Sequence, residues 1–172
     1  MNRDLVILVD ELDNEVGTEE KLKAHEEGKL HRAVSAFVFN ATGDMLIQKR
    51  ASTKYHSPGL WSNAACTHPQ PNEENKLAAE RRLMEEMGFT TPLTFHSTLL
   101  YKAPFDNGLT EHEYDHILLG DFNGTPNINP DEVSEWKWMS LEAIEADMKE
   151  NPQRYTEWFK IIFDKFYNQI ER

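Results

Sequence analysis

A single cysteine, Cys66, stands among the 172 residues, so no disulfide can form within the chain. Long apolar runs are also missing: the longest, such as residues 36–39, are of strand length, far below the roughly 20 residues of a membrane-spanning helix. The N-terminal segment places acidic residues around a short apolar stretch, which is unlike a secretory signal. Together these absences predict a cytoplasmic protein that does not enter a membrane.

Positive charge is scarce as well. The chain carries 18 basic residues against 30 acidic ones, for a formal net charge of −12 at pH 7. A surface this negative repels nucleic acid and anionic lipid, which argues against both as partners. An anionic substrate would need a local group of cations or metal ions. No repeat or Pro/Gly-rich linker divides the chain, and its length predicts one domain over residues 1–172.

Hydrophobic patterning predicts strands mixed with helices, and therefore an α+β fold, α/β/α-like, in which helices flank a mixed β-sheet. Thr18 is predicted to cap a short helix, Gly88 to end a longer one, and Ser140 to cap a third. The predicted strands are 5–9, 33–39, 45–48, 97–102, 112–122 and 135–139, and the longer helices are 73–87, 140–149 and 154–169.

The helix predicted at 73–87 carries Glu73 and ends in Arg81-Arg82-Leu83-Met84-Glu85-Glu86-Met87-Gly88. Carboxylates on one helix face can hold Mg²⁺, which neutralises a diphosphate. A solvated helix with arginine–glutamate pairs four residues apart is the simpler alternative. The segment resembles the Nudix box, except that Thr67 replaces its opening glycine and Arg82 replaces a metal-binding glutamate. A guanidinium at that position favours holding a diphosphate over cleaving it.

Two pairs of reactive side chains have the spacing of extended segments. Cys66 and His68 are two residues apart, as are Glu111 and Glu113, so each pair shares one face. A lone cysteine usually fills space in a core, and polar edge strands are common, so neither pair is informative by itself. Imidazoles together with carboxylates suit a first-row divalent ion such as Mn²⁺ or Zn²⁺. The candidate ligands are His25, His31, His68, Glu111 and Glu113.

In combination, these motifs resemble the type 1 isopentenyl-diphosphate isomerases, metal-dependent enzymes built on the Nudix scaffold. The resemblance covers roughly residues 21–158, and its most diagnostic part is Trp61-Ser62-Asn63-Ala64-Ala65-Cys66-Thr67-His68-Pro69. It implies a Nudix core at about residues 30–160 with an N-terminal extension. It also implies isomerisation of isopentenyl diphosphate to dimethylallyl diphosphate through a tertiary carbocation, in isoprenoid precursor biosynthesis.

The resemblance also implies roles for single residues. Glu113 would deliver the first proton, oriented by Tyr101, and Cys66 would take the second from the opposite face; the two roles can exchange with the direction of the reaction. Trp158 would offer a π face to the cation. Mg²⁺ would be held by Glu86 and the backbone carbonyl of Cys66. The predicted diphosphate clamp is Lys21, Arg50, Lys54 and Arg82.

Two other functions stay open on the sequence. A Nudix-type hydrolase of a small diphosphate compound would release phosphate or a monophosphate and tolerate loss of Cys66. A non-catalytic metal- or diphosphate-binding protein would keep the clamp without the thiol. For the isomerase, the expected partner is a small prenyl diphosphate, and the protein is a monomer or homodimer. The remaining histidines are predicted to be structural or surface residues: His56, His96, His112 and His116.

Overall fold

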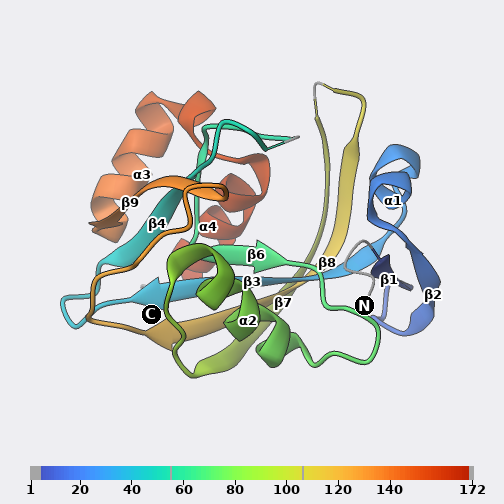
Figure 1. Cartoon of the computed structure of the whole chain (residues 1–172). Coiled ribbons are helices and arrows are strands. Elements are labelled where there is room, and N and C mark those ends of the chain that lie inside the picture. Colours follow the sequence, from blue (N-terminus) through green and yellow to red (C-terminus); the bar gives the residue numbers. More distant parts are fainter. Residues whose placement is uncertain (1–4, 55, 106, 171–172) are drawn as a thin grey trace.

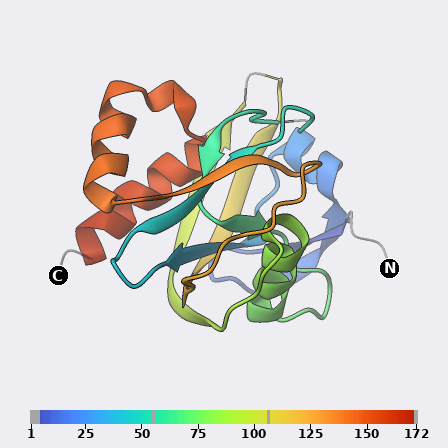
Figure 2. The same ribbon diagram turned by 60° about the vertical axis from the view of Figure 1, so that its left-hand side comes forward.

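Three layers make up the structure, a computed structural model that describes residues 5–54, 56–105 and 107–170. A nine-stranded mixed sheet forms the middle layer, with α2 on one face and α3 and α4 on the other (Figures 1 and 2). The strands are β1 (Leu5–Val9), β2 (Glu15–Glu20), β3 (His31–Phe39), β4 (Met45–Arg50), β5 (Trp61–Ser62), β6 (Ala65–Thr67), β7 (Leu93–Pro104), β8 (Thr110–Asp121) and β9 (Val133–Met139). The helices are α1 (Lys21–Glu27), α2 (Asn75–Met87), α3 (Leu141–Glu150), the 3₁₀ turn η1 (Pro152–Arg154) and α4 (Glu157–Ile170).

Strand β3 lies at the centre and supplies both hydrophobic cores. Val34, Ala36 and Val38 pack with α2, whereas Phe37, from the alternate set of positions, packs with the aromatic residues of α4. A strand buried on both faces is expected to be apolar almost throughout, as this one is. After His31 and Arg32 at its start, Ser35 is the polar exception in β3 and is 2% exposed.

Two neighbours of β3 bring the reactive residues to it from different strands. Strand β6 pairs antiparallel with β3, and Cys66 lies opposite Ser35. Strand β8 runs parallel to β3, and Glu113 lies opposite His31. The sheet therefore places the thiol and the carboxylate on two different strands that both pair with β3.

The fold class is confirmed, and the predicted strands and helices all appear within a few residues of their predicted bounds. Gly88 ends α2 with a positive φ of 71°, and its N–H donates to Met84 O over 3.2 Å. A Cβ there would lie 2.2 Å from Asn127 O, so both the positive φ and this close approach require glycine. Ser140 caps α3, its hydroxyl accepting from Ala143 N–H at 3.2 Å.

The prediction for Thr18 is wrong. Thr18 lies in β2, opposite Ile7 of β1, and α1 begins only at Lys21, after a cap position at Glu20 whose side chain makes no capping bond. The N–H of Glu20, which a cap at Thr18 would have served, donates instead to Oε1 of Glu19 at 2.9 Å. Both short strands, β5 and β6, also went unpredicted. Among the described helices, none is long and apolar enough to cross a membrane.

Candidate active site

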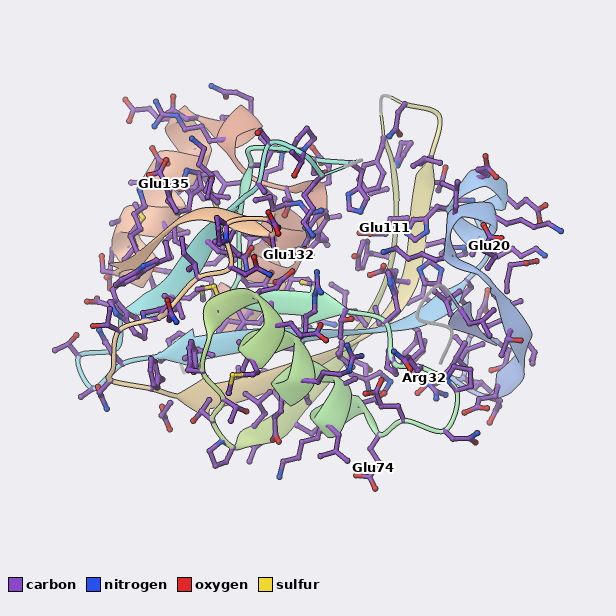
Figure 3. All side chains as sticks on the ribbon, viewed as in Figure 1. Glu20, Arg32, Glu74, Glu111, Glu132 and Glu135 are labelled. Atoms are coloured by element: carbon purple, nitrogen blue, oxygen red, sulfur yellow. The ribbon has the colours of Figure 1, made fainter. Side chains whose placement is uncertain are left out.

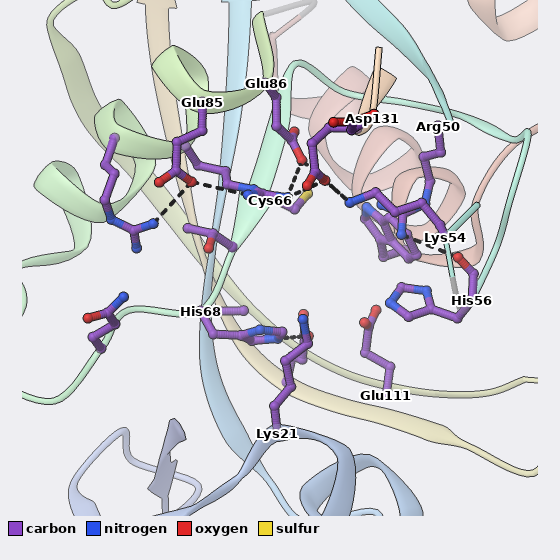
Figure 4. A pocket seen from close by; sticks show the side chains of 18 of the residues that line it. Lys21, Arg50, Lys54, His56, Cys66, His68, Glu85, Glu86, Glu111 and Asp131 are labelled. Carbon is purple, nitrogen blue, oxygen red and sulfur yellow. Dashed lines mark hydrogen bonds and ion pairs between the residues drawn. The ribbon is translucent and has the colours of Figure 1, made fainter. Parts of the chain in front are cut away.

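A polar cavity of about 480 Å³ lies between the ends of several elements, with α1 and β8 on one side and α2 on the other (Figure 4). Close up, Glu86, Lys54 and Arg50 lie along one side and Lys21, His68 and Glu111 along the other. With all side chains drawn, Glu111 and Glu132 lie near the centre, whereas Glu20, Glu74 and Glu135 lie at the periphery (Figure 3). The predicted site residues that line the cavity are Lys21, Arg50, Lys54, Cys66, His68, Arg82, Glu86, Tyr101, Glu111, Glu113 and Trp158.

Beside the cavity, four of the five predicted metal ligands converge. Ligand atoms of His25, His31, His68 and Glu113 all lie within 4.8 Å of one another. His25 Nδ1 bonds Lys21 O at 2.7 Å and His31 Nδ1 bonds Lys29 O at 2.8 Å.

A carbonyl only accepts, so each Nδ1 of these two rings is the N–H donor, and in the neutral form of each ring Nε2 keeps a lone pair. Nε2 of His25 and of His31 is buried and has no hydrogen-bond partner among the described residues. Two such atoms aimed at a carboxylate and a third imidazole fit a divalent metal ion. The described residues therefore include a histidine–glutamate cluster suited to a metal.

Glu111 stays outside this compact set, with Oε2 at 3.9 Å from His25 Nε2. Burial, and then the charge of Glu113, raise the pKa of Glu111 to about 7. The Tyr101 hydroxyl lies 2.7 Å from an oxygen of Glu111 and 2.7 Å from an oxygen of Glu113. One hydroxyl proton cannot serve two carboxylates, so the second short contact needs a proton on one of them, and Glu111 is the carboxyl whose raised pKa fits.

Cys66 and Glu113 differ in protonation. Burial, and then the charge of Asp115, raise the pKa of the Cys66 thiol far above its usual value, so the thiol is protonated at neutral pH. Burial also acts to raise the pKa of Glu113, but the imidazoles of His31 and His68 outweigh it and hold that pKa well below its usual range. The transferable proton is therefore on the sulfur of Cys66. This corresponds to the predicted acid–base pair with its roles exchanged, so that Cys66 is the acid and Glu113 the base.

On the α2 side, the predicted clamp meets an acidic residue that the sequence analysis did not identify. Arg82 Nη2 lies 2.6 Å from Glu86 Oε2 and 2.8 Å from Glu132 Oε1, and Lys54 Nζ also contacts Glu132. The arginine–glutamate pairs predicted for a solvated helix, Arg81–Glu85 and Arg82–Glu86, do form, but the second pair also lines the cavity. Arg82 also contacts Glu85, at 3.1 Å, so carboxylates already neutralise Arg82 and Lys54 here, and a diphosphate would add negative charge that an accompanying Mg²⁺ would offset.

Trp158 forms part of the cavity wall and is 3% exposed. The Arg50 guanidinium lies 5.1 Å from the centroid of its ring. His56 meets the same ring edge-on at 5.7 Å and stacks on Phe105 at 5.1 Å. Burial, and then the charge of Arg50, lower the pKa of His56 to about 2, so its ring is neutral. The neutral His56 ring and the aromatic face of Trp158 suit the hydrocarbon half of a substrate, and Arg50 brings a positive charge beside them for its anionic half.

The other histidines were predicted to be structural or surface residues. His56 is buried and stacks on Phe105, as a structural residue would, and it also lines the cavity. His112 bonds Gly28 O at 3.1 Å and His116 bonds Asp13 at 2.8 Å, away from the cavity, as the alternation along β8 predicts.

Comparison with known proteins agrees with this geometry. The NUDIX domain family model matches residues 29–159. The chain is 48% identical over 162 residues to isopentenyl-diphosphate Delta-isomerase 2 of Aromatoleum aromaticum, covering 94% of this chain and 86% of that protein. The chain belongs to the isopentenyl-diphosphate Delta-isomerase family. A second family member, isopentenyl-diphosphate Delta-isomerase 2 of Photorhabdus laumondii, is 48% identical over 169 residues, with 98% and 96% coverage.

Solved structures of much lower sequence identity share the fold of this chain. DR0079 from Deinococcus radiodurans superposes with a TM-score of 0.74 at 19% identity, over 92% of this chain and 96% of that one. The MutT protein from Methanosarcina mazei gives 0.68 at 18% identity, over 83% and 96%. At such identities the similarity shows the fold alone.

Proposed function

We propose that the chain interconverts isopentenyl diphosphate and dimethylallyl diphosphate. The observation that carries the proposal is the placement of Cys66 and Glu113, on two different strands that pair with β3 and in one cavity. A double bond can be moved by adding a proton to its terminal carbon and removing another from the carbon two positions away. That chemistry needs two proton-transferring groups on different sides of one substrate.

In the forward direction, one of the pair protonates the terminal CH₂ and leaves a tertiary carbocation. The other removes a proton from the allylic carbon and restores a double bond, with no net change in protons. The Trp158 face stabilises the cation between the two steps, by about 2 kcal/mol or more once water is excluded. Tyr101 orients Glu113 through its 2.7 Å hydrogen bond.

Metal ions complete the proposed site. His25, His31, His68 and Glu113, with Glu111 as a further candidate, would hold one Mn²⁺ or Zn²⁺, whose charge beside Glu113 would tune the acidity of that carboxyl. Glu86 and the backbone carbonyl of Cys66 would hold Mg²⁺ together with the substrate diphosphate. The clamp for the phosphate oxygens is Lys21, Arg50, Lys54 and Arg82.

Incubation with isopentenyl diphosphate and Mg²⁺ in D₂O tests the proposal directly. Deuterium is expected in the new methyl group of dimethylallyl diphosphate, observed by proton and carbon NMR, with no release of phosphate. Phosphate or a monophosphate without deuterated product would indicate a Nudix hydrolase instead. Binding without any turnover would indicate a binding protein.

Arg82→Glu is expected to weaken binding of Mg²⁺–pyrophosphate by about 10–100-fold, because one charge-assisted contact is worth roughly 1.5–3 kcal/mol. Isothermal titration calorimetry measures the affinity. Arg154→Glu, at a site that is 57% exposed in the turn before α4, makes the same change in net charge and should leave the affinity unchanged. Equal affinities of the Arg82 variant and the parent protein would remove Arg82 from the clamp.

Chelation of the transition metal is expected to lower the melting temperature, because ions that bind only the folded state stabilise it by about 2.7–4.1 kcal/mol at 100–1,000 times Kd. Re-addition of Mn²⁺ or Zn²⁺ should restore the melting temperature, as differential scanning calorimetry would show. His31→Gln should abolish this metal-dependent rise in melting temperature, whereas His112→Gln, whose ring lies outside the cluster, should keep it. A rise in melting temperature that His31→Gln does not change would contradict the metal site.

A further inference from the structure

A third carboxyl group follows Glu111 and Glu113 on the same face of β8. Asp115 is completely buried and does not line the cavity. Its Oδ2 accepts a 2.6 Å hydrogen bond from the Ser35 hydroxyl, and its Oδ1 has no hydrogen-bond partner among the described residues. A buried carboxyl with so few partners costs folding free energy compared with an apolar side chain. We therefore expect Asp115 to contribute through the side chain that it binds, Ser35.

Asp115 holds Ser35, and Ser35 lies against the thiol. The distance from Ser35 Oγ to Cys66 Sγ is 3.3 Å, within hydrogen-bonding range for sulfur. Ser35 and Cys66 are direct partners in the β3–β6 ladder, so the backbone fixes this neighbourhood. The residues beside Ser35 on β3 are apolar, and packing alone would be satisfied by alanine at this position.

A second contact holds the thiol from another direction. Asn63 Nδ2 donates to Ala36 O and to Ala65 O, both at 3.0 Å, which fixes the orientation of the amide. Its Oδ1 consequently faces the sulfur, at 3.3 Å, and can only accept. The single Ser35 hydrogen goes to Asp115, so Ser35 Oγ faces the sulfur as an acceptor, and the thiol hydrogen can point to either Ser35 Oγ or Asn63 Oδ1.

We propose that Ser35 is a positioning residue for Cys66: anchored by Asp115, its hydroxyl keeps the sulfur aimed into the cavity. Asp115 acts only through Ser35 and touches no substrate. This inference rests on the proposed isomerase function and adds to it a residue pair 80 positions apart in sequence.

Ser35→Ala tests the inference in the full-length protein loaded with its metal ions. We expect kcat to fall roughly 10–100-fold, since small displacements of a catalytic group cost that much, while KM stays within about twofold. Ser35→Thr retains a hydroxyl and suits a strand, so it should recover most of the lost rate. Ser97→Ala removes a hydroxyl from β7, where it bonds His96, and serves as the matched control with unchanged kcat.

Changes at Asp115 separate its role as an anchor from that of a charge. Asp115→Asn keeps an acceptor oxygen for Ser35 and should retain most of the activity. Asp115→Leu removes the acceptor and should lower kcat as Ser35→Ala does. Equal losses in both Asp115 variants, with parental kcat in Ser35→Ala, would overturn the proposal.

A deuterium-partition measurement distinguishes positioning from a general loss of stability. In D₂O the carbocation either returns to substrate or goes on to product, and the thiol takes part in one of these two steps. Ser35→Ala should therefore change the ratio of deuterium in recovered isopentenyl diphosphate to that in dimethylallyl diphosphate. The ratio rises if the thiol removes the allylic proton, and falls if the thiol protonates the alkene.

A Ser35→Ala protein with the parental ratio and parental kcat would overturn the proposal. So would a lower kcat at the parental ratio, because that pattern reports only a loss of active protein. Failure of the parent protein itself to turn over isopentenyl diphosphate would contradict the proposed function, which keeps the two failures distinct.

Discussion

Isomerisation is expected to fall by about 10²–10⁴-fold or more when Cys66 is replaced by alanine, the range assigned to a positioned acid or base. Sulfur is the titratable atom that β6 presents to the cavity, and alanine leaves no proton carrier in its place. The substitution removes one atom from a residue of intermediate exposure at the edge of a core, so the fold should be retained. Steady-state kinetics with isopentenyl diphosphate, together with circular dichroism, measures both effects.

Two further measurements make the Cys66 result specific. Cys66→Ser keeps the size and the backbone but has a much weaker acid, so it should be as inactive as the alanine variant. Both variants should still bind Mg²⁺–pyrophosphate with the parental affinity, because the carbonyl of residue 66 remains. Turnover within tenfold of the parent in the alanine variant would remove the thiol from the mechanism.

Periodicity along single strands explains what the sequence predicted correctly. Alternation places Cys66 with His68, and Glu111 with Glu113, on shared faces, and both pairs line one cavity. The likeness to a known family then joined these separate pairs, together with His25 and His31, into one site. Spacing alone could not do so, because it does not show which strands become neighbours.

Contacts between strands and loops that are far apart in the sequence explain why the sequence analysis missed Asp115 and Glu132. Ser35 meets Asp115 because β3 and β8 pair in parallel in one register, and that register is a property of the assembled sheet. Glu132 reaches Arg82 from the loop before β9, 50 residues along the chain. Neither Asp115 nor Glu132 lies in a motif, and the physical signal for each is a contact made only on folding.

The wrong assignment of Thr18 as a helix cap has a related cause. Thr18, followed by two glutamates, has the local composition of a helix start, and α1 does begin a few residues later. The β1–β2 ladder takes Thr18 instead, because pairing with the buried strand β1 satisfies its backbone groups. Local propensity was outweighed by a tertiary contact.

Glu113→Gln is expected to abolish isomerisation and, unlike Cys66→Ala, to weaken the metal site as well. Glu113 serves both functions: one oxygen lies 2.9 Å from His68 Nε2 in the ligand cluster, and the other lies 2.7 Å from the Tyr101 hydroxyl. Glutamine keeps the volume and can still bond Tyr101, but it has neither the charge that a cation needs nor a carboxylate that can take up and release a proton. We therefore expect a loss of about 10²–10⁴-fold in kcat, and a smaller metal-dependent rise in melting temperature.

Comparison of three glutamine variants separates these roles. Glu135→Gln makes the same chemical change on the exposed side of β9 and should leave kcat and the metal response unchanged. Glu111→Gln lies outside the compact ligand set and should retain more of the metal response than Glu113→Gln. Parental turnover in Glu113→Gln would remove this carboxylate from proton transfer. An unchanged metal response would remove it from the metal site, and because the two measurements are independent, each role stands or falls separately.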